Sequence, residues 1–139
     1  MLDYAQLKIK AYTHWDLYLH ANQCYLGRVF LQLKDDKGFD DFLAISEEVR
    51  EEFFLIGKEI KRVLKSLWGP DKMNYAALSN VSEKIHVHFI PRYQQMREFQ
   101  GMLFTDSRWG QNYAPYDLSF ILEESALFAI RDALKNLLK

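Results

Sequence analysis

The sequence predicts an α+β fold in which an antiparallel sheet carries two main helices, and two kinds of periodicity lead to this expectation. Short segments of alternating or continuous apolar character are typical of strands. Four such segments occupy 14–22, 27–34, 73–80 and 84–93. Two longer segments, 46–69 and 120–139, repeat apolar residues at three- and four-residue steps, which is typical of amphipathic helices. The order strand, strand, helix, strand, strand, helix favours an antiparallel sheet packed against helices.

The first two strands are expected to form a hairpin. HWDLYLHAN (14–22) is rich in aromatic residues, and GRVFLQLK (27–34) begins at Gly27, which marks a tight turn between the two strands. The polar segment 35–45 follows as a connector and ends in apolar residues that anchor it.

The first helix has recognisable ends. Ser46 is a suitable N-cap, and Glu47 and Glu48 follow in the first turn, where carboxylates interact favourably with the helix dipole. The pair Gly69-Pro70 is expected to end the helix. Its apolar stripe consists of Val49, Phe53, Ile56, Ile60, Val63 and Leu67. We interpret this stripe as core packing, with a groove for a partner as the alternative.

The second half of the chain predicts two more strands and a closing helix. MNYAALSN (73–80) and KIHVHFIPRY (84–93) are expected to be joined by a short turn through 81–83. Residues 94–117 show no clear period and are expected to be irregular. The C-terminal segment 120–139 carries a second apolar stripe of Leu122, Leu127, Ile130, Leu134 and Leu137.

Composition limits the function classes. A chain of 139 residues with 49% hydrophobic and 27% charged residues predicts one globular domain, 1–139. A net charge of -1 argues against a general nucleic-acid binder. The sequence has no signal-peptide pattern and no apolar stretch long enough for a membrane span. Cys24 is the single cysteine, so no internal disulfide is expected and a cytoplasmic location is the simplest interpretation.

The candidate chemistry lies in KIHVHFIPRY. Because side chains alternate along a strand, Lys84, His86 and His88 share one face. The other face carries Ile85, Val87 and Phe89, which must pack into the core. Side chains two residues apart lie roughly 6.5 to 7 Å from each other, a spacing that lets two groups hold one phosphate.

Three interpretations of this histidine pair remain open. The pair is a half-exposed surface feature, part of a zinc site, or the centre of nucleophilic catalysis at phosphorus. Zinc needs further ligands, and His14, His20 and Cys24 form no recognisable set with the pair, so we expect no metal and no other cofactor. A neutral imidazole is an effective nucleophile near pH 7, and a cation such as Lys84 disfavours its protonation. A second, protonated imidazole would stabilise charge that develops on oxygen.

KIHVHFIPRY resembles the signature strand of the histidine triad (HIT) family of nucleotide hydrolases and transferases, His-x-His-x-His, two apolar residues and often Pro-Arg. Lys84 stands where the family has its first histidine. YLGRVFLQLK (25–34) is similar to the family's Pro-Gly-His stretch, with Leu26 and Arg28 in place of the proline and histidine. MNYAALSN resembles the strand that leads into the triad, and RWGQNYAPY (108–116) resembles the diadenosine polyphosphate hydrolase branch. The similarity covers most of residues 15 to 116.

The resemblance implies roles for individual residues. His86 would attack the α-phosphate of an adenosine polyphosphate such as diadenosine tetraphosphate and form a nucleotidyl-histidine, and His88 would hydrogen-bond the phosphate or the departing oxygen. His20 falls at the ribose-binding position and Asn80 is placed to reach the phosphate, with a merely structural role at strand ends as the alternative for both. The resemblance also implies a homodimer joined through the sheet or a helix.

The two departures, Lys84 and Arg28, are expected to lie close together because their strands belong to one sheet. Two neighbouring cations would repel each other unless an anion sits between them, so we interpret the change as adaptation to a more anionic substrate that both contact. A nucleotide-binding module with impaired catalysis is the alternative, followed by a structural or partner-docking role without nucleotide. The leaving group and the acceptor, water or another group, stay open.

Overall fold

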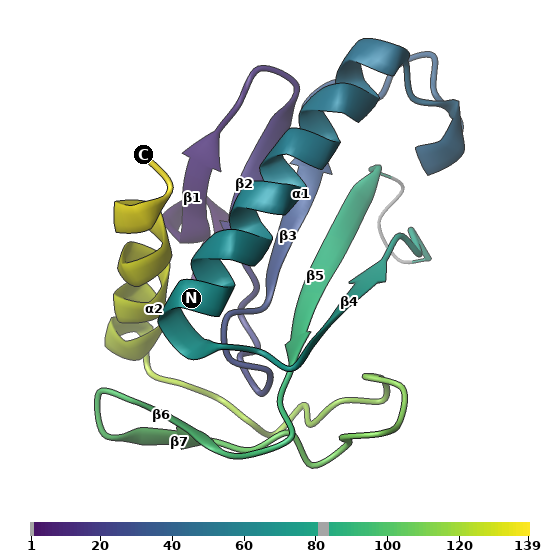
Figure 1. Ribbon diagram of the computed structural model, residues 1–139. Coiled ribbons are helices and arrows are strands. Elements are labelled where there is room, and N and C mark those ends of the chain that lie inside the picture. The colour runs from purple at the N-terminus through teal and green to yellow at the C-terminus, as the bar shows by residue number, and fades with distance from the viewer. Residues whose placement is uncertain (1, 81–83) are drawn as a thin grey trace.

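The computed structural model describes residues 2–80 and 84–139 and has the expected α+β architecture (Figure 1). An antiparallel sheet of five strands has the order β1-β2-β3-β5-β4. Its strands are β1 (Lys8–Ala11), β2 (Trp15–Leu19), β3 (Val29–Leu33), β4 (Lys72–Ala76) and β5 (His86–Arg92). The helices are α1 (Glu47–Trp68) and α2 (Glu124–Leu137), with short 3-10 turns η1 (Tyr4–Leu7) and η2 (Phe42–Ala44).

Helix α1 lies across one face of the sheet, as Figure 1 shows, and has the predicted ends. The Ser46 side chain accepts a hydrogen bond from the Val49 N–H, and Gly69 ends the helix in the left-handed conformation with φ of 57°. The Phe53 and Phe89 rings pack 5.8 Å apart between centroids and join the helix to β5. The buried stripe is therefore core, although Leu64 and Trp68 are buried and the expected Leu67 is only half-buried.

Gly27 allows the loop between β2 and β3 to pack closely against α1. The two strands pair as the expected hairpin, but residues 20–28 form a longer loop than a tight turn. Gly27 has φ of 89°, and a Cβ atom there would lie 2.6 Å from the Leu64 side chain. Only glycine satisfies both the backbone conformation and this close approach.

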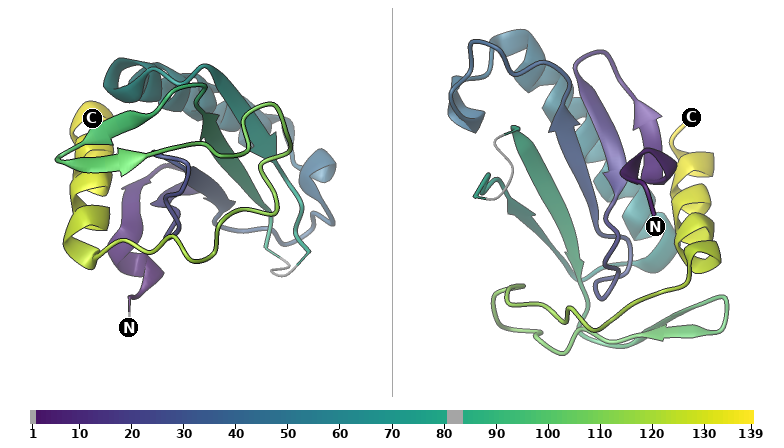
Figure 2. Two further views of the ribbon diagram at one scale, coloured as in Figure 1. Left: turned by 90° about the horizontal axis from the view of Figure 1, so that it is seen from below. Right: turned by 180° about the vertical axis from the view of Figure 1, so that it is seen from behind.

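Helix α2 lies beside β1 at one edge of the sheet (Figures 1 and 2). The Lys10 ammonium donates to the Leu138 carbonyl over 2.8 Å, which fixes the end of the chain to this strand. The helix begins at Glu124, later than the expected residue 120. Leu122 therefore precedes the helix, and Leu137 is 43% exposed, so the buried stripe narrows to Leu127, Ile130 and Leu134.

Several elements differ from the expectation. Strand β1 was not predicted, and segment 94–117 contains a hairpin of β6 (Arg97–Phe99) and β7 (Met102–Phe104) instead of being wholly irregular. Its turn places Gln100 and Gly101 at positive φ. Strand β4 ends at Ala76, short of the expected residue 80, and β5 begins at His86. The turn expected through 81–83 lies outside the described residues.

Candidate functional site

The histidine pair lies on the sheet face opposite α1. Ile85, Val87 and Phe89 are buried in the core, whereas His86 and His88 are half-buried on the other face, so the predicted alternation along β5 is confirmed. This face is turned toward the viewer in the right-hand view of Figure 2, where α1 passes behind the sheet. Strand pairing places Gln32 opposite His86 and Phe30 opposite His88.

A pocket of about 670 Å³ opens on this face. Its lining combines the histidines with a group of aromatic rings and a few polar side chains. The lining residues are Asp3, Tyr4, Ala5, Lys8, Tyr18, His20, Phe30, Gln32, His86 and His88. Tyr18 and Phe30 stack with ring centroids 5.2 Å apart, and Tyr4 meets both rings edge-on. The pocket therefore has an aromatic end on η1, β2 and β3 and an imidazole end on β5.

His86 is oriented by the backbone of the residue two positions earlier. Its Nδ1 lies 2.8 Å from the Lys84 carbonyl oxygen. A carbonyl oxygen only accepts hydrogen bonds, so Nδ1 carries the proton in this contact and a neutral His86 keeps its lone pair on Nε2. Nε2 is then the nucleophilic atom of the ring.

His88 stands next to His86, with ring centroids 5.0 Å apart, and contacts a buried cation. Its Nδ1 lies 3.4 Å from Nη2 of Arg28. Burial, followed by the charges of Arg28 and His86, lowers the pKa of His88 to about 4. His88 is therefore neutral near pH 7, and the expectation of a protonated second imidazole is wrong.

His20 also belongs to this cluster. It directly follows β2, and its ring centroid lies 5.6 Å from that of His88. Burial, then Arg28 and His88, lowers the pKa of His20 to about 3. Its Nδ1 is held at 3.0 Å from the backbone nitrogen of Asn22. The structure thus places His20 on the pocket wall, while its expected role toward ribose stays a prediction.

Arg28 is almost completely buried, with 2% of its surface exposed. The guanidinium carbon lies 4.5 Å from the ring centroid of Tyr116 and 5.4 Å from that of Tyr113, so the segment around 113–116 covers it. Within the part of the chain that the structure describes, Nε and Nη1 have no hydrogen-bond partner. A buried guanidinium in this state is costly and gives the imidazole end of the pocket a positive field.

Lys84 and Arg28, the two departures that the family resemblance implied, do not lie close together. Val29 pairs with Phe89, so Arg28 stands opposite Ile90, six residues beyond Lys84. At 3.3 Å per residue this separation is about 20 Å along β5. The expected repulsion between the two cations, and its relief by one shared anion, are therefore wrong. Lys84 is exposed and reaches the site through its carbonyl oxygen, the acceptor for His86.

Asn80 is exposed and lies four residues past the end of β4, and it is not among the residues that line the pocket. Its role toward phosphate stays a prediction. Conversely, the sequence did not single out Tyr4, Tyr18 or Phe30. Alternation along each strand places Tyr18 on the same face as His20, and Phe30 on the same face as Arg28, but nothing local pointed to Tyr4.

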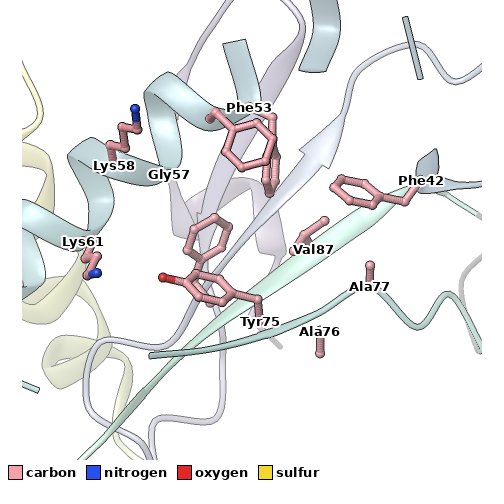
Figure 3. A pocket seen from close by; sticks show the side chains of 11 residues that line it. Phe42, Phe53, Gly57, Lys58, Lys61, Tyr75, Ala76, Ala77 and Val87 are labelled. Atoms are coloured by element: carbon pink, nitrogen blue, oxygen red, sulfur yellow. The ribbon is translucent and has the colours of Figure 1, made fainter. Parts of the chain in front are cut away.

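A second pocket, of about 500 Å³, opens on the helix side of the sheet between α1 and β4 (Figure 3). Phe53, Tyr75 and Val87 point into it, and Lys58 and Lys61 stand on its helical rim. This lining is mainly aromatic and aliphatic and contains no histidine. The candidate site is therefore the pocket that holds the imidazoles.

Residues 2–80 and 84–139 contain no cluster of three or more His, Cys, Asp or Glu side chains arranged to hold a metal ion. Over the same residues, no helix is both long and apolar enough to cross a membrane. Burial raises the pKa of the Cys24 thiol, so this half-buried cysteine stays protonated.

Solved structures with the same architecture include several histidine triad proteins. One from Bradyrhizobium japonicum superposes with a TM-score of 0.78 at 17% sequence identity, over 95% of this chain and 90% of that chain. One from Marinobacter aquaeolei VT8 superposes with a TM-score of 0.77 at 22% sequence identity, over 94% of this chain and 87% of that chain. A Zn-bound histidine triad family protein from Mycobacterium smegmatis superposes with a TM-score of 0.57 at 19% sequence identity, over 94% of this chain and 85% of that chain.

No protein-family model matches the sequence, and no curated protein gives a significant sequence match. The structural likeness nevertheless covers almost the whole chain, and it extends over the five-stranded sheet and both helices. The chain therefore has the α+β fold of histidine triad proteins. The resemblance to the diadenosine polyphosphate hydrolase branch stays a prediction.

Proposed function

We propose that residues 1–139 form a single histidine-triad-like domain that acts as a nucleotide hydrolase or nucleotidyl transferase on the α-phosphate of adenosine polyphosphates. The observation that carries the proposal is the orientation of His86. Its Nδ1 donates to the Lys84 carbonyl, which leaves the Nε2 lone pair in a pocket whose volume of about 670 Å³ suits a nucleotide.

The two ends of the pocket match the two ends of a nucleotide. A base stacks on aromatic rings with little dependence on its identity, and Tyr4, Tyr18 and Phe30 supply such rings. The phosphate then falls at His86 and His88, with the field of Arg28 behind them. His20, whose ring centroid lies 5.6 Å from that of His88 and 6.2 Å from that of Phe30, is the candidate for ribose.

In the proposed chemistry, Nε2 of His86 attacks the α-phosphorus, and the bond to the leaving oxygen breaks. The product is a nucleotidyl-histidine, which water or another acceptor resolves by attack at phosphorus with return of the electron pair to Nε2. His88 hydrogen-bonds an oxygen of the phosphate and stabilises the charge that develops there. The cycle uses no cofactor.

The alternative is a nucleotide-binding module without turnover, and the replacement of the family's first histidine by Lys84 favours it. One experiment separates the two. The protein is incubated with diadenosine tetraphosphate, and products are resolved by chromatography while binding is measured by calorimetry. Attack at the α-phosphorus predicts adenosine triphosphate and, after hydrolysis, adenosine monophosphate. Saturable binding with the dinucleotide left intact would instead support the binding module.

We also propose a cytoplasmic homodimer joined through β4. Of the two edge strands of the sheet, β1 lies beside α2, whereas within the described residues β4 pairs with β5 alone. Tyr75 on β4 is 54% exposed, next to the apolar pocket of Figure 3. An edge strand beside an apolar surface favours pairing with a second chain. Light scattering of the protein and of a Tyr75→Lys variant tests this: a wild-type monomer would contradict it.

A further inference from the structure

We propose that Arg28 locks His88 as the tautomer protonated on Nε2, so that the site favours nucleotides whose leaving group departs as a stable anion, such as a polyphosphate, over those with an amine leaving group. The tautomer rests on geometry alone, whereas the preference for a leaving group rests on the proposed function. His88 becomes a fixed hydrogen-bond donor, and Arg28 is a positioning residue that acts through it.

The contact between Arg28 and His88 defines the tautomer. A guanidinium has only donors and stays charged at every pH at which proteins are folded. Nη2 of Arg28 lies 3.4 Å from Nδ1 of His88, so Nδ1 of His88 must be the acceptor. A neutral His88 ring then carries its proton on Nε2. Arg28 is 2% exposed and its guanidinium lies against Tyr116, so the position of this group is fixed by packing.

The neighbouring His86 is held as the opposite tautomer, with its proton on Nδ1. At His86 the Lys84 carbonyl accepts from Nδ1, so Nε2 bears the lone pair. The same ring atom is thus a nucleophile in His86 and a donor in His88. This division of roles depends on two different partners, a backbone carbonyl for one ring and a guanidinium for the other.

The surroundings of His88 oppose its protonation. Among the described residues, the titratable and charged groups that face it are Arg28, His86 on its own strand, and His20 from the end of β2. On the paired strands, Phe30 and Ala76 stand opposite it and carry no charge. Protonation would direct an Nδ1–H toward the Arg28 donor and place a second charge beside a buried cation, in line with a pKa of about 4 for His88.

A neutral imidazole hydrogen-bonds an oxygen well but is a very weak acid. When Nε2 of His86 forms its bond to phosphorus, the electron pair of the broken bond leaves with the departing group. A phosphate oxygen carries that pair as a stable anion at neutral pH, so no proton is required. An amine departs readily only if its nitrogen is protonated, and neither His88 nor His20 is charged to supply that proton.

The first test observes the tautomer directly and needs no substrate. Long-range ¹H–¹⁵N spectra of the ¹⁵N-labelled protein at neutral pH are expected to show His88 with a bare Nδ1 and a protonated Nε2. In Arg28→Met, the ring is expected to lose this preference and to titrate closer to an ordinary imidazole. Arg28→Lys, which keeps a charge and a donor, is the matched control. A proton on Nδ1 in the wild-type protein would overturn the proposal whatever the variants do.

The second test compares leaving groups. For the wild-type protein, kcat/KM is expected to be at least about 100-fold higher for diadenosine tetraphosphate than for adenosine 5′-phosphoramidate, the lower range of a general-acid contribution. In Arg28→Met the ratio is expected to fall about tenfold or more, because His88 can then be protonated. Equal turnover of both substrates by the wild type would overturn the leaving-group inference. Turnover of neither would contradict the proposed function while the spectra still decide the tautomer.

Discussion

Replacement of His86 by asparagine separates the nucleophile from the architecture around it. The asparagine amide still offers an N–H to the Lys84 carbonyl, which accepts from Nδ1 of His86 over 2.8 Å in the native protein. The strand and the pocket are therefore expected to persist. What disappears is the Nε2 lone pair, and with it the covalent step.

The expected magnitudes differ sharply between binding and turnover. Most of the pocket's lining lies outside His86, on β1–β3 and the N-terminal turn, so the variant loses about one hydrogen bond to the nucleotide. One hydrogen bond of about 0.5 to 1.5 kcal/mol corresponds to a dissociation constant raised about 2- to 13-fold. The loss of a nucleophile, by contrast, is expected to lower kcat by about 10⁴-fold or more.

The assay combines calorimetric binding of diadenosine tetraphosphate with single-turnover chromatography of its products. His14→Asn is the matched control, because His14 lies 3.8 Å from the exposed Glu48 at the start of α1 and is not among the residues that line the pocket. This control is expected to retain both binding and turnover. If His86→Asn turned over within tenfold of the native rate, the nucleophile would be elsewhere and the mechanistic argument would fail.

Three further predictions concern other parts of the molecule. Asp106 forms a buried ion pair with Arg92 at 2.7 Å, so Asp106→Ala is expected to reduce the free energy of unfolding by about 3 to 5 kcal/mol, measured in urea. Lys84→Ala keeps the carbonyl that orients His86, so kcat is expected to change little. The KM is expected to rise more for a polyphosphate than for a monophosphate ester, because the lysine charge contacts the chain of phosphates. An equal loss of kcat/KM on both substrates would exclude that contact. His20 and His88 have pKa values lowered to about 3 and about 4, so unfolding takes up protons below the ordinary imidazole value of about 6.5. The stabilisation that these two neutral rings provide is complete above that pH and is lost as the pH falls toward 4. The loss is at most about 1.4 kcal/mol per pH unit for each ring, and less for the half-buried His88 because of solvent screening. In His88→Asn, the free energy of unfolding measured in urea should depend less steeply on pH.

Local patterns predicted the elements that depend on local chemistry. The ends of α1 followed from Ser46 and Gly69, and the two faces of β5 followed from a period of two. Strand β1 escaped prediction because a strand of four residues is stabilised by its pairing with β2 and by burial of Ile9, not by its own pattern. The β6–β7 hairpin, with three residues in each strand, is a similar case.

The site was predicted less completely because it is assembled from distant segments. Alternation placed His86 and His88 on one face, but only the register between β3 and β5 reveals that Arg28 and Lys84 stand at opposite ends of β5. Register depends on which residues pair across strands, and a single sequence does not fix that pairing. The ring of Tyr4 reaches the pocket from the N-terminal turn, and the ring of Tyr116 reaches Arg28 from the loop before α2. Neither segment has a sequence period that predicts these contacts.

The departure from the triad pattern that the resemblance implies at residue 84 would have a specific physical consequence. The group that orients His86 is the carbonyl of residue 84, and a backbone carbonyl is present whatever side chain that residue carries. Exchange of histidine for lysine there therefore leaves the orientation of the proposed nucleophile intact. Arg28 differs, because its contact with His88 is made by the side chain itself and no backbone group replaces it. Of the two departures, the one at Arg28 thus has the larger effect on the proposed chemistry.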